Sequence, residues 1–137
     1  MCSIRNTGEA SFTPPEFDTN VKIGTPIVPD EIPYGSAMLV EYEVAMAALV
    51  TVKDRDAYIY FCNDRSNDVW MKIRLLTSEG KIVGESGLIK PDEYLEKVSL
   101  QVKSVGTEVV VKVMCYEPNT YHSKGSAQFS LPTISVS

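Results

Sequence analysis

Short runs in which apolar residues alternate strictly with polar ones constrain this chain more than any other feature. Between Val69 and Leu75, the odd positions hold Val, Met, Ile and Leu, whereas the even positions hold Trp, Lys and Arg. Between Val109 and Cys115 the odd positions are again apolar, and Lys112 stands at an even one. Because successive side chains of a strand point to opposite faces of a sheet, this period of two predicts half-buried strands rather than helices.

Turn-forming residues separate these runs at intervals of roughly ten residues, as expected of a protein built from many short strands. The segment Met38–Val52 also alternates but is longer than an ordinary strand. We therefore expect a bend or bulge near Ala45–Ala48, or two strands that switch sheets there. Together these features predict an all-β fold, an antiparallel immunoglobulin-like β-sandwich of roughly seven to nine strands.

The length of the chain fits a single domain. It has 137 residues, of which 44% are hydrophobic, enough to build one sizeable core. Residues 1–20 include Pro14 and Pro15 and lack apolar periodicity, so we expect a flexible N-terminal arm or tether there. The immunoglobulin-like domain is expected to span residues 21–137.

The charge balance excludes several classes of partner. With 13 basic and 18 acidic side chains the net charge is −5, which disfavours nucleic acid and anionic membrane surfaces. The longest uncharged apolar run, Val44–Val52, is far shorter than the about 20 residues that a transmembrane helix needs. We therefore expect no nucleic-acid partner and no transmembrane segment.

The three cysteines bear on cellular location and on redox state. Cys2 lies in a polar stretch without an apolar signal segment before it, so either the protein is not exported or Cys2 is the lipidated residue of a mature lipoprotein. Cys62 and Cys115 are spaced rather like the intersheet disulfide of immunoglobulin domains. The alternation, however, points Cys115 inward and Cys62 outward, so we expect both thiols to be reduced.

The motifs of catalysis and metal binding are incomplete. Ser86 lies in a Gly-Glu-Ser-Gly sequence like a nucleophile elbow, but Leu88 replaces the final glycine and no helix is expected to follow. The only histidine, His122, lies in a predicted polar loop, and residues 64–68 lack the glycine and glutamate of a calcium loop. We expect no catalytic residue, no metal and no cofactor.

One predicted surface has the composition of an interaction site. Trp70, Lys72 and Arg74 project together from the outer face of their strand, and tryptophan, arginine and tyrosine are common at binding hot spots. We expect tyrosines of a neighbouring strand beside them, and the loop 116–122 is a second candidate. Alternatively, the basic side chains or the N-terminal arm merely cover Trp70. The candidate binding residues are Trp70, Lys72, Arg74, Tyr58, Tyr60 and Tyr121.

The sequence from Asp56 onward resembles small immunoglobulin-like, lipoprotein-like surface modules of Gram-positive gut bacteria. The stretches that carry the resemblance are 59–63, 67–74, 85–94 and 113–121. The most specific is Ser-Gly-Leu-Ile-x-Pro-x-x-Tyr, which begins at Ser86. The resemblance implies an extracellular, non-catalytic sandwich and assigns no functional residues.

These observations favour a non-enzymatic, surface-displayed binding or assembly module. Its partner is expected to be a protein or a glycan at a surface, and self-association is compatible with the same features. Two alternatives stay open: a decoration or fibre component of a virion or other extracellular particle, and a carbohydrate-binding accessory domain that uses the Trp70 surface.

Overall fold

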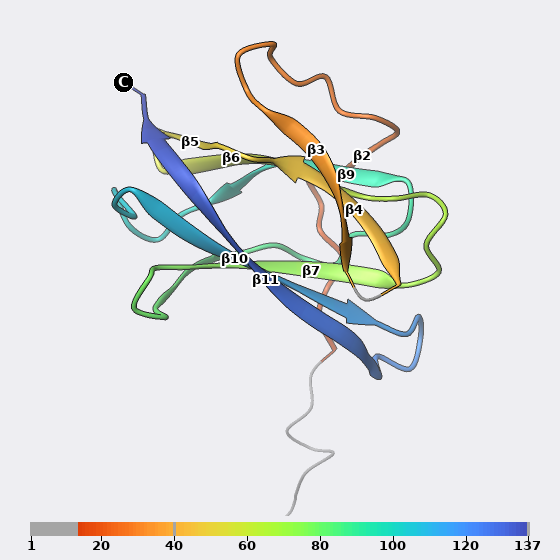
Figure 1. Cartoon of the computed structure of the whole chain (residues 1–137). Coiled ribbons are helices and arrows are strands. Elements are labelled where there is room, and N and C mark those ends of the chain that lie inside the picture. The colour runs from red at the N-terminus through yellow and green to blue at the C-terminus, as the bar shows by residue number, and fades with distance from the viewer. Residues whose placement is uncertain (1–13, 40, 137) are drawn as a thin grey trace, which may run out of the picture.

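The computed structural model describes residues 14–39 and 41–136, and within them the chain is all-β (Figure 1). No helix occurs in these residues, and hence none that could cross a membrane, which confirms the predicted all-β class. The strands are β2 (Lys22–Ile23), β3 (Tyr34–Leu39), β4 (Tyr42–Ala47), β5 (Val50–Lys53), β6 (Asp56–Asn63), β7 (Trp70–Leu76), β8 (Ile82–Glu85), β9 (Glu93–Ser99), β10 (Glu108–Tyr116) and β11 (Ser123–Ser135).

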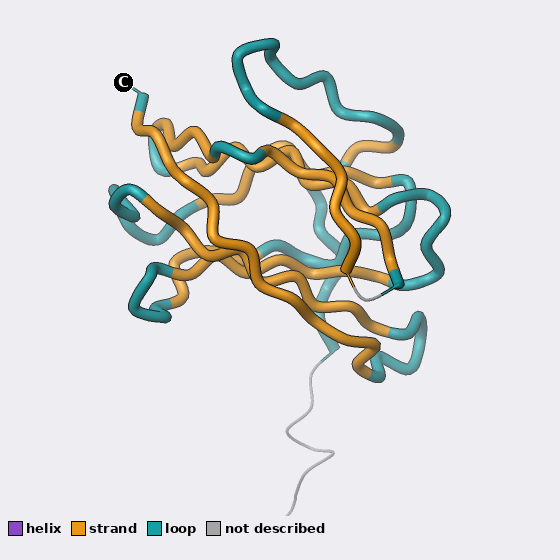
Figure 2. The backbone as a smooth tube through the Cα atoms, viewed as in Figure 1, coloured by secondary structure: helices purple, strands orange, loops and turns teal. Residues whose placement is uncertain are grey.

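All these strands belong to one sheet, which curls around a common core (Figure 2). Its strand order is β2-β9-β6-β5-β11-β10-β7-β8, with β4 also paired to β6 and β3 paired to β4. The sheet has two halves, one around β5, β6 and β9 and the other around β7, β10 and β11. Core side chains such as Phe61 of the first half and Ile73 and Val111 of the second are fully buried. The period-two pattern therefore identified the inward-facing positions of β7 and β10 correctly.

The sheet is mixed, and so the expectation of purely antiparallel pairing is wrong at one place. β11 pairs antiparallel with β10 as far as Pro132 and then parallel with β5 from Thr133 onward. Pro132 has no N–H group, which suits the end of a ladder. Beyond it, Thr133 donates its N–H to Thr107 O at 3.0 Å and its hydroxyl to Gly106 O at 2.6 Å. Pairing with β10 sets the direction of β11, which therefore reaches β5 as a parallel neighbour.

The predicted interruption in the segment 38–52 is confirmed. β4 ends at Ala47 and β5 begins at Val50, and both pair with β6. Ala45 is paired with Cys62, and Thr51 is paired with Tyr58. The chain therefore advances six residues from Ala45 to Thr51, whereas their partners in β6 are only four residues apart. The two additional residues produce a bend within the same sheet rather than a switch between sheets.

Part of the predicted N-terminal arm is bound to the sheet. Leu88 donates its N–H to Glu16 O at 2.8 Å, and Asp18 donates its N–H to Leu88 O at 3.0 Å. Gly87 donates its N–H to the Asp18 carboxylate at 2.8 Å, and a Cβ at Gly87 would lie only 2.5 Å from Asp18 N. The close approach therefore requires glycine at this position. Residues 1–13, including Cys2, lie outside the described residues.

Candidate functional site

Aromatic side chains gather around Trp70, at the surface that the sequence predicts as an interaction site. The Trp70 ring lies in edge-to-face contact with Phe17, with ring centroids 4.8 Å apart. The Tyr121 ring also meets the Trp70 ring edge to face, with centroids 5.9 Å apart. Lys90 lies 4.4 Å from the centre of the Phe17 ring. We name the outer surface formed by Phe17, Trp70, Lys72, Arg74 and Tyr121 the Trp70 face.

The Trp70 face brings together four of the six predicted binding residues, because the loop between β10 and β11 carries Tyr121 to Trp70. Phe17 was not among the predicted residues, because it lies in an irregular segment without apolar periodicity. The alternative in which the N-terminal arm covers Trp70 is the one that fits the observed contact with Phe17.

The basic side chains of the Trp70 face are already paired. Arg74 Nε lies 2.6 Å from the Glu85 carboxylate, and Lys72 Nζ lies 3.8 Å from the same oxygen. Glu85 belongs to β8, which pairs with β7 and so presents its side chain beside both bases. One carboxylate thus serves two basic side chains, so the positive charge of this face is partly balanced within the chain.

Tyr58 and Tyr60 do not lie beside Trp70, and this part of the prediction is wrong. Their strand, β6, is separated from β7 by β5, β11 and β10 in the strand order. The connection after β6 crosses between the halves of the sheet and is fixed by Asn63. Its buried side-chain amide donates to Val69 O and to Ile89 O, both at 2.9 Å.

The two tyrosines instead line an apolar groove on the outer surface of β5, β6 and the end of β11. The groove has a volume of about 500 Å³. We name it the tyrosine groove. It is lined by Pro29, Glu31, Ile32, Leu49, Thr51, Lys53, Tyr58, Tyr60, Ile134 and Val136.

Strand pairing places the middle of the tyrosine groove on rigid backbone. Thr51 of β5 is paired with Tyr58 of β6 on one side and with Ile134 of β11 on the other. Side chains paired in this way across neighbouring strands stand on the same face of the sheet. Ile134 is 49% exposed and Val136 is 44% exposed, so the apolar rim of the groove faces solvent.

Tyr60 forms the deep end of the groove through a bulge in β6. Tyr58 is paired with Lys97 whereas Phe61 is paired with Leu95, so β6 has one more residue than β9 at this point. Tyr60 has φ of 50°, a rare conformation for a bulky residue, and its carbonyl accepts a hydrogen bond from the Tyr34 hydroxyl at 3.0 Å. Such a conformation persists only where the surrounding contacts enforce it.

The phenol of Tyr60 remains neutral at physiological pH. Burial, and after it the nearby groups of Glu96, Tyr58 and Glu31, raises the pKa of Tyr60 above its ordinary value of 10.0. A neutral, largely buried phenol provides apolar surface and one hydroxyl to the groove.

The tyrosine groove carries opposite charges at its two ends. Lys53 is exposed and stands next to the turn that joins β5 to β6, two residues beyond Thr51 on the same face of β5. Glu31 is exposed and lies near Tyr60, whose pKa it helps to raise, beside the start of β5 and hence at the other end. Its segment is held by the bond from Ala48 N to Pro33 O at 2.8 Å. Within the described part of the chain, neither Lys53 nor Glu31 forms an ion pair.

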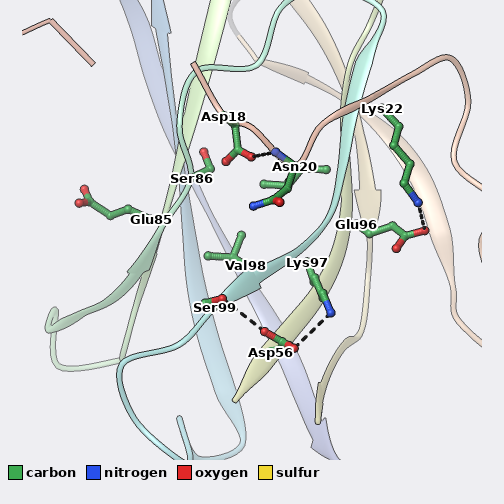
Figure 3. A pocket seen from close by; sticks show the side chains of 11 residues that line it. Asp18, Asn20, Lys22, Asp56, Glu85, Ser86, Glu96, Lys97, Val98 and Ser99 are labelled. Carbon is green, nitrogen blue, oxygen red and sulfur yellow. Dashed lines mark hydrogen bonds and ion pairs between the residues drawn. The ribbon is translucent and has the colours of Figure 1, made fainter. Parts of the chain in front are cut away.

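A second hollow, of about 580 Å³, lies beside β8 and β9 and is polar (Figure 3). Four of its charged groups pair with one another: Lys22 pairs with Glu96 at 3.5 Å and Lys97 with Asp56 at 3.3 Å. Ser86, which lines the hollow, donates its hydroxyl to Gly87 O at 2.7 Å and accepts the N–H of Ile73 at 2.9 Å. Backbone groups therefore both donate to this hydroxyl and accept from it.

The described cysteines are both free, as predicted. Burial raises the pKa of the Cys115 thiol to about 12. Burial, followed by the charges of Asp64 and Asp92, also raises the pKa of Cys62. Since the thiolate is the reactive form, neither position favours nucleophilic chemistry. The residues that the structure describes also include no group of three or more His, Cys, Asp or Glu side chains suited to a metal ion.

Comparison with known proteins adds no assignment: no family model matches the chain, and no curated protein does. The function is therefore inferred from the chain's own geometry. Among the surfaces formed by the described residues, the tyrosine groove combines exposed apolar side chains with unpaired charges. This combination is suited to binding another molecule.

Proposed function

We propose that this protein is a non-enzymatic binding or assembly module with an immunoglobulin-like sandwich fold, and that it binds through the tyrosine groove. The observation that carries the proposal is the exposure of Ile134 and Val136 on a face of three paired strands. An apolar surface that is held rigid and left open to solvent loses little conformational entropy when a partner covers it.

The order of the strands supports the immunoglobulin-like part of the proposal. In such sandwiches the strands A, B and E lie side by side in one sheet, and C, F and G in the other. Here β5, β6 and β9 are neighbours in that order, and β7, β10 and β11 form the second group. The parallel contact between β5 and β11 then joins the two groups along one edge.

The side chains of the groove support binding rather than catalysis. Tyrosine and branched apolar residues are typical anchors of interfaces, whereas a catalytic pocket encloses its substrate and directs several polar groups at it. The groove is open, and its ionisable ends, Lys53 and Glu31, lie on either side of an apolar middle.

Display at a cell surface, with attachment through the N-terminal arm, is part of the same proposal. The bonds of residues 16–18 to the sheet would fix the point at which a tether leaves the domain. Mass spectrometry of the native protein tests the attachment, and a lipid on Cys2 is the expected result. An unmodified native Met1 would favour the particle-component alternative.

Site-specific photo-crosslinking in the producing cells tests the binding surface. A benzophenone amino acid in place of Ile134 is expected to give an adduct of discrete mass. The same group in place of Ser130, an exposed position on the β10-paired part of β11, is the matched control and is expected to give none. Absence of any adduct from position 134 would contradict the proposed function.

A further inference from the structure

We infer that the partner bound by the tyrosine groove is a second copy of this chain, in a dimer with twofold symmetry. This inference rests on the proposed function and names its partner. It depends on three properties of the groove: its two charged ends, its apolar middle and its local neutrality.

The two charged ends make the groove complementary to itself. Lys53 lies at one end and Glu31 at the other, and both are exposed and without an ion-pair partner among the described residues. A twofold axis through the middle of the groove exchanges the ends of the two copies. Lys53 then faces Glu31 of the partner subunit, and the same pair forms a second time across the axis.

The middle of the groove supplies the apolar contact that such a dimer needs. Thr51 and Ile134 are paired between the two ends, and Val136 continues the apolar rim. Exposed ion pairs at the rim contribute little affinity but fix the register of the two copies. The burial of Ile134 and Val136 therefore provides the main driving force, and the charges select the orientation.

The groove is also a surface where two copies can meet without a net excess of like charge. The chain carries a net charge of −5, so two copies repel each other at long range. The lining of the groove contains one acidic and one basic side chain, and its net charge is therefore zero. A different acidic or basic partner would find one end of the groove favourable and the other unfavourable, whereas a second copy satisfies both.

Sedimentation velocity of the full chain over a range of concentrations tests this inference through charge reversal. Wild-type protein is expected to dimerise. Lys53→Glu places two pairs of glutamates across the axis, and Glu31→Lys places two pairs of lysines there. Each variant is expected to weaken dimerisation roughly tenfold or more, because like charges that face each other in an interface are unfavourable.

Mixing the two variants provides the decisive arm. In a heterodimer of Lys53→Glu with Glu31→Lys, both positions across the axis again carry opposite charges, so dimerisation should return to near the wild-type level. The double variant in one chain should dimerise with itself. Lys103→Glu, which makes the same charge change at an exposed lysine outside the groove, should dimerise like wild type.

Several results would overturn the inference. These are a wild-type chain that stays monomeric, single variants that dimerise as well as wild type, and a mixture that fails to recover. All the substituted side chains are exposed, and unchanged thermal melting of the variants confirms that they fold. A photo-adduct from position 134 with a different protein would overturn the dimer while supporting the proposed function, whereas no adduct would contradict the proposed function itself.

Discussion

The Trp70 face and the tyrosine groove lie on the outer surfaces of two halves of the same curled sheet, yet they use their aromatic side chains differently. On the Trp70 face, Trp70 contacts Phe17 and Tyr121, and the basic residues share the carboxylate of Glu85. In the tyrosine groove, apolar side chains are exposed, and Lys53 and Glu31 have no ion-pair partner in the part of the chain that the structure describes. Hot-spot composition is thus a weak guide to a binding surface unless one knows which groups are already occupied within the molecule.

The largest expected effect concerns the core that supports both surfaces. Val111 is fully buried, and Val111→Asp would bury an unpaired charge, at a cost of about 4 kcal/mol or more in the free energy of unfolding. We expect the cooperative melting transition, followed by circular dichroism, to be lost or strongly lowered. Lys112→Asp, at the outward-facing neighbour, is the control and should melt close to wild type. An unchanged melting temperature for Val111→Asp would show that the strand faces the other way.

The next largest effect concerns Asn63, which holds the connection between β6 and β7. Asn63→Ala removes the side-chain donors to Val69 O and Ile89 O and the acceptor of the Asn67 amide. Ile89 O keeps the N–H of Met71, so the loss of a partner falls mainly on Val69 O. We expect a loss of about 2–3 kcal/mol in the free energy of unfolding, measured by urea denaturation. Arg65→Ala, at an exposed position in the same turn, should change it by less than about 0.5 kcal/mol. Equal losses for the two variants would refute the role given to Asn63.

Alkaline pH should destabilise the Trp70 half of the sheet through Cys115. The pKa of its thiol in the folded protein, about 12, lies above the ordinary 9.0. The neutral thiol therefore makes its full contribution to the free energy of unfolding below about pH 9, and this contribution is lost as the pH rises toward 12. Between pH 9.0 and 10.5, the free energy of unfolding of the wild type should fall by about 1.5 kcal/mol more than that of Cys115→Ala. The measurement is urea denaturation of both proteins at each pH. A difference that stays constant over this range would contradict the burial of the thiol.

A smaller effect should expose the Trp70 face itself. The chain has one tryptophan, so its fluorescence reports on this surface alone. Phe17→Ala should shift the emission to longer wavelength and cost about 1 kcal/mol, because it removes a ring that packs on Trp70. Ile23→Ala, at a side chain 78% exposed, should leave the emission unchanged. Identical spectra for wild type and Phe17→Ala would show that Phe17 does not cover Trp70.

Local features of the fold were predictable from the sequence, because alternation reports directly on which side chains of a strand face inward. It correctly placed Ile59 and Phe61 in the core, Cys62 away from it, and a bend between β4 and β5. Strand neighbours were harder to predict, since alternation contains no information on pairing. For this reason the parallel contact of β11 with β5 was missed.

The candidate surfaces were predicted only in part, for related reasons. Tyr58 and Tyr60 were recognised as outward-facing aromatic residues but placed beside the wrong strand, because a turn sequence does not tell a hairpin from a crossing between halves of a sheet. Ile134 and Lys53 were not predicted as site residues, because each is of a type that is common in strands. Only the packing of β5, β6 and β11 assembles them into one groove.

Sedimentation velocity of two matched aspartate variants compares the two surfaces most directly. Ile134→Asp introduces a charge into the tyrosine groove, and Phe17→Asp introduces one into the Trp70 face, at side chains of similar exposure, 49% and 41%. We predict that Ile134→Asp sediments as a monomer where wild type and Phe17→Asp sediment as dimers. A dimer that survives Ile134→Asp but dissociates with Phe17→Asp would contradict the assignment of the groove as the contact surface.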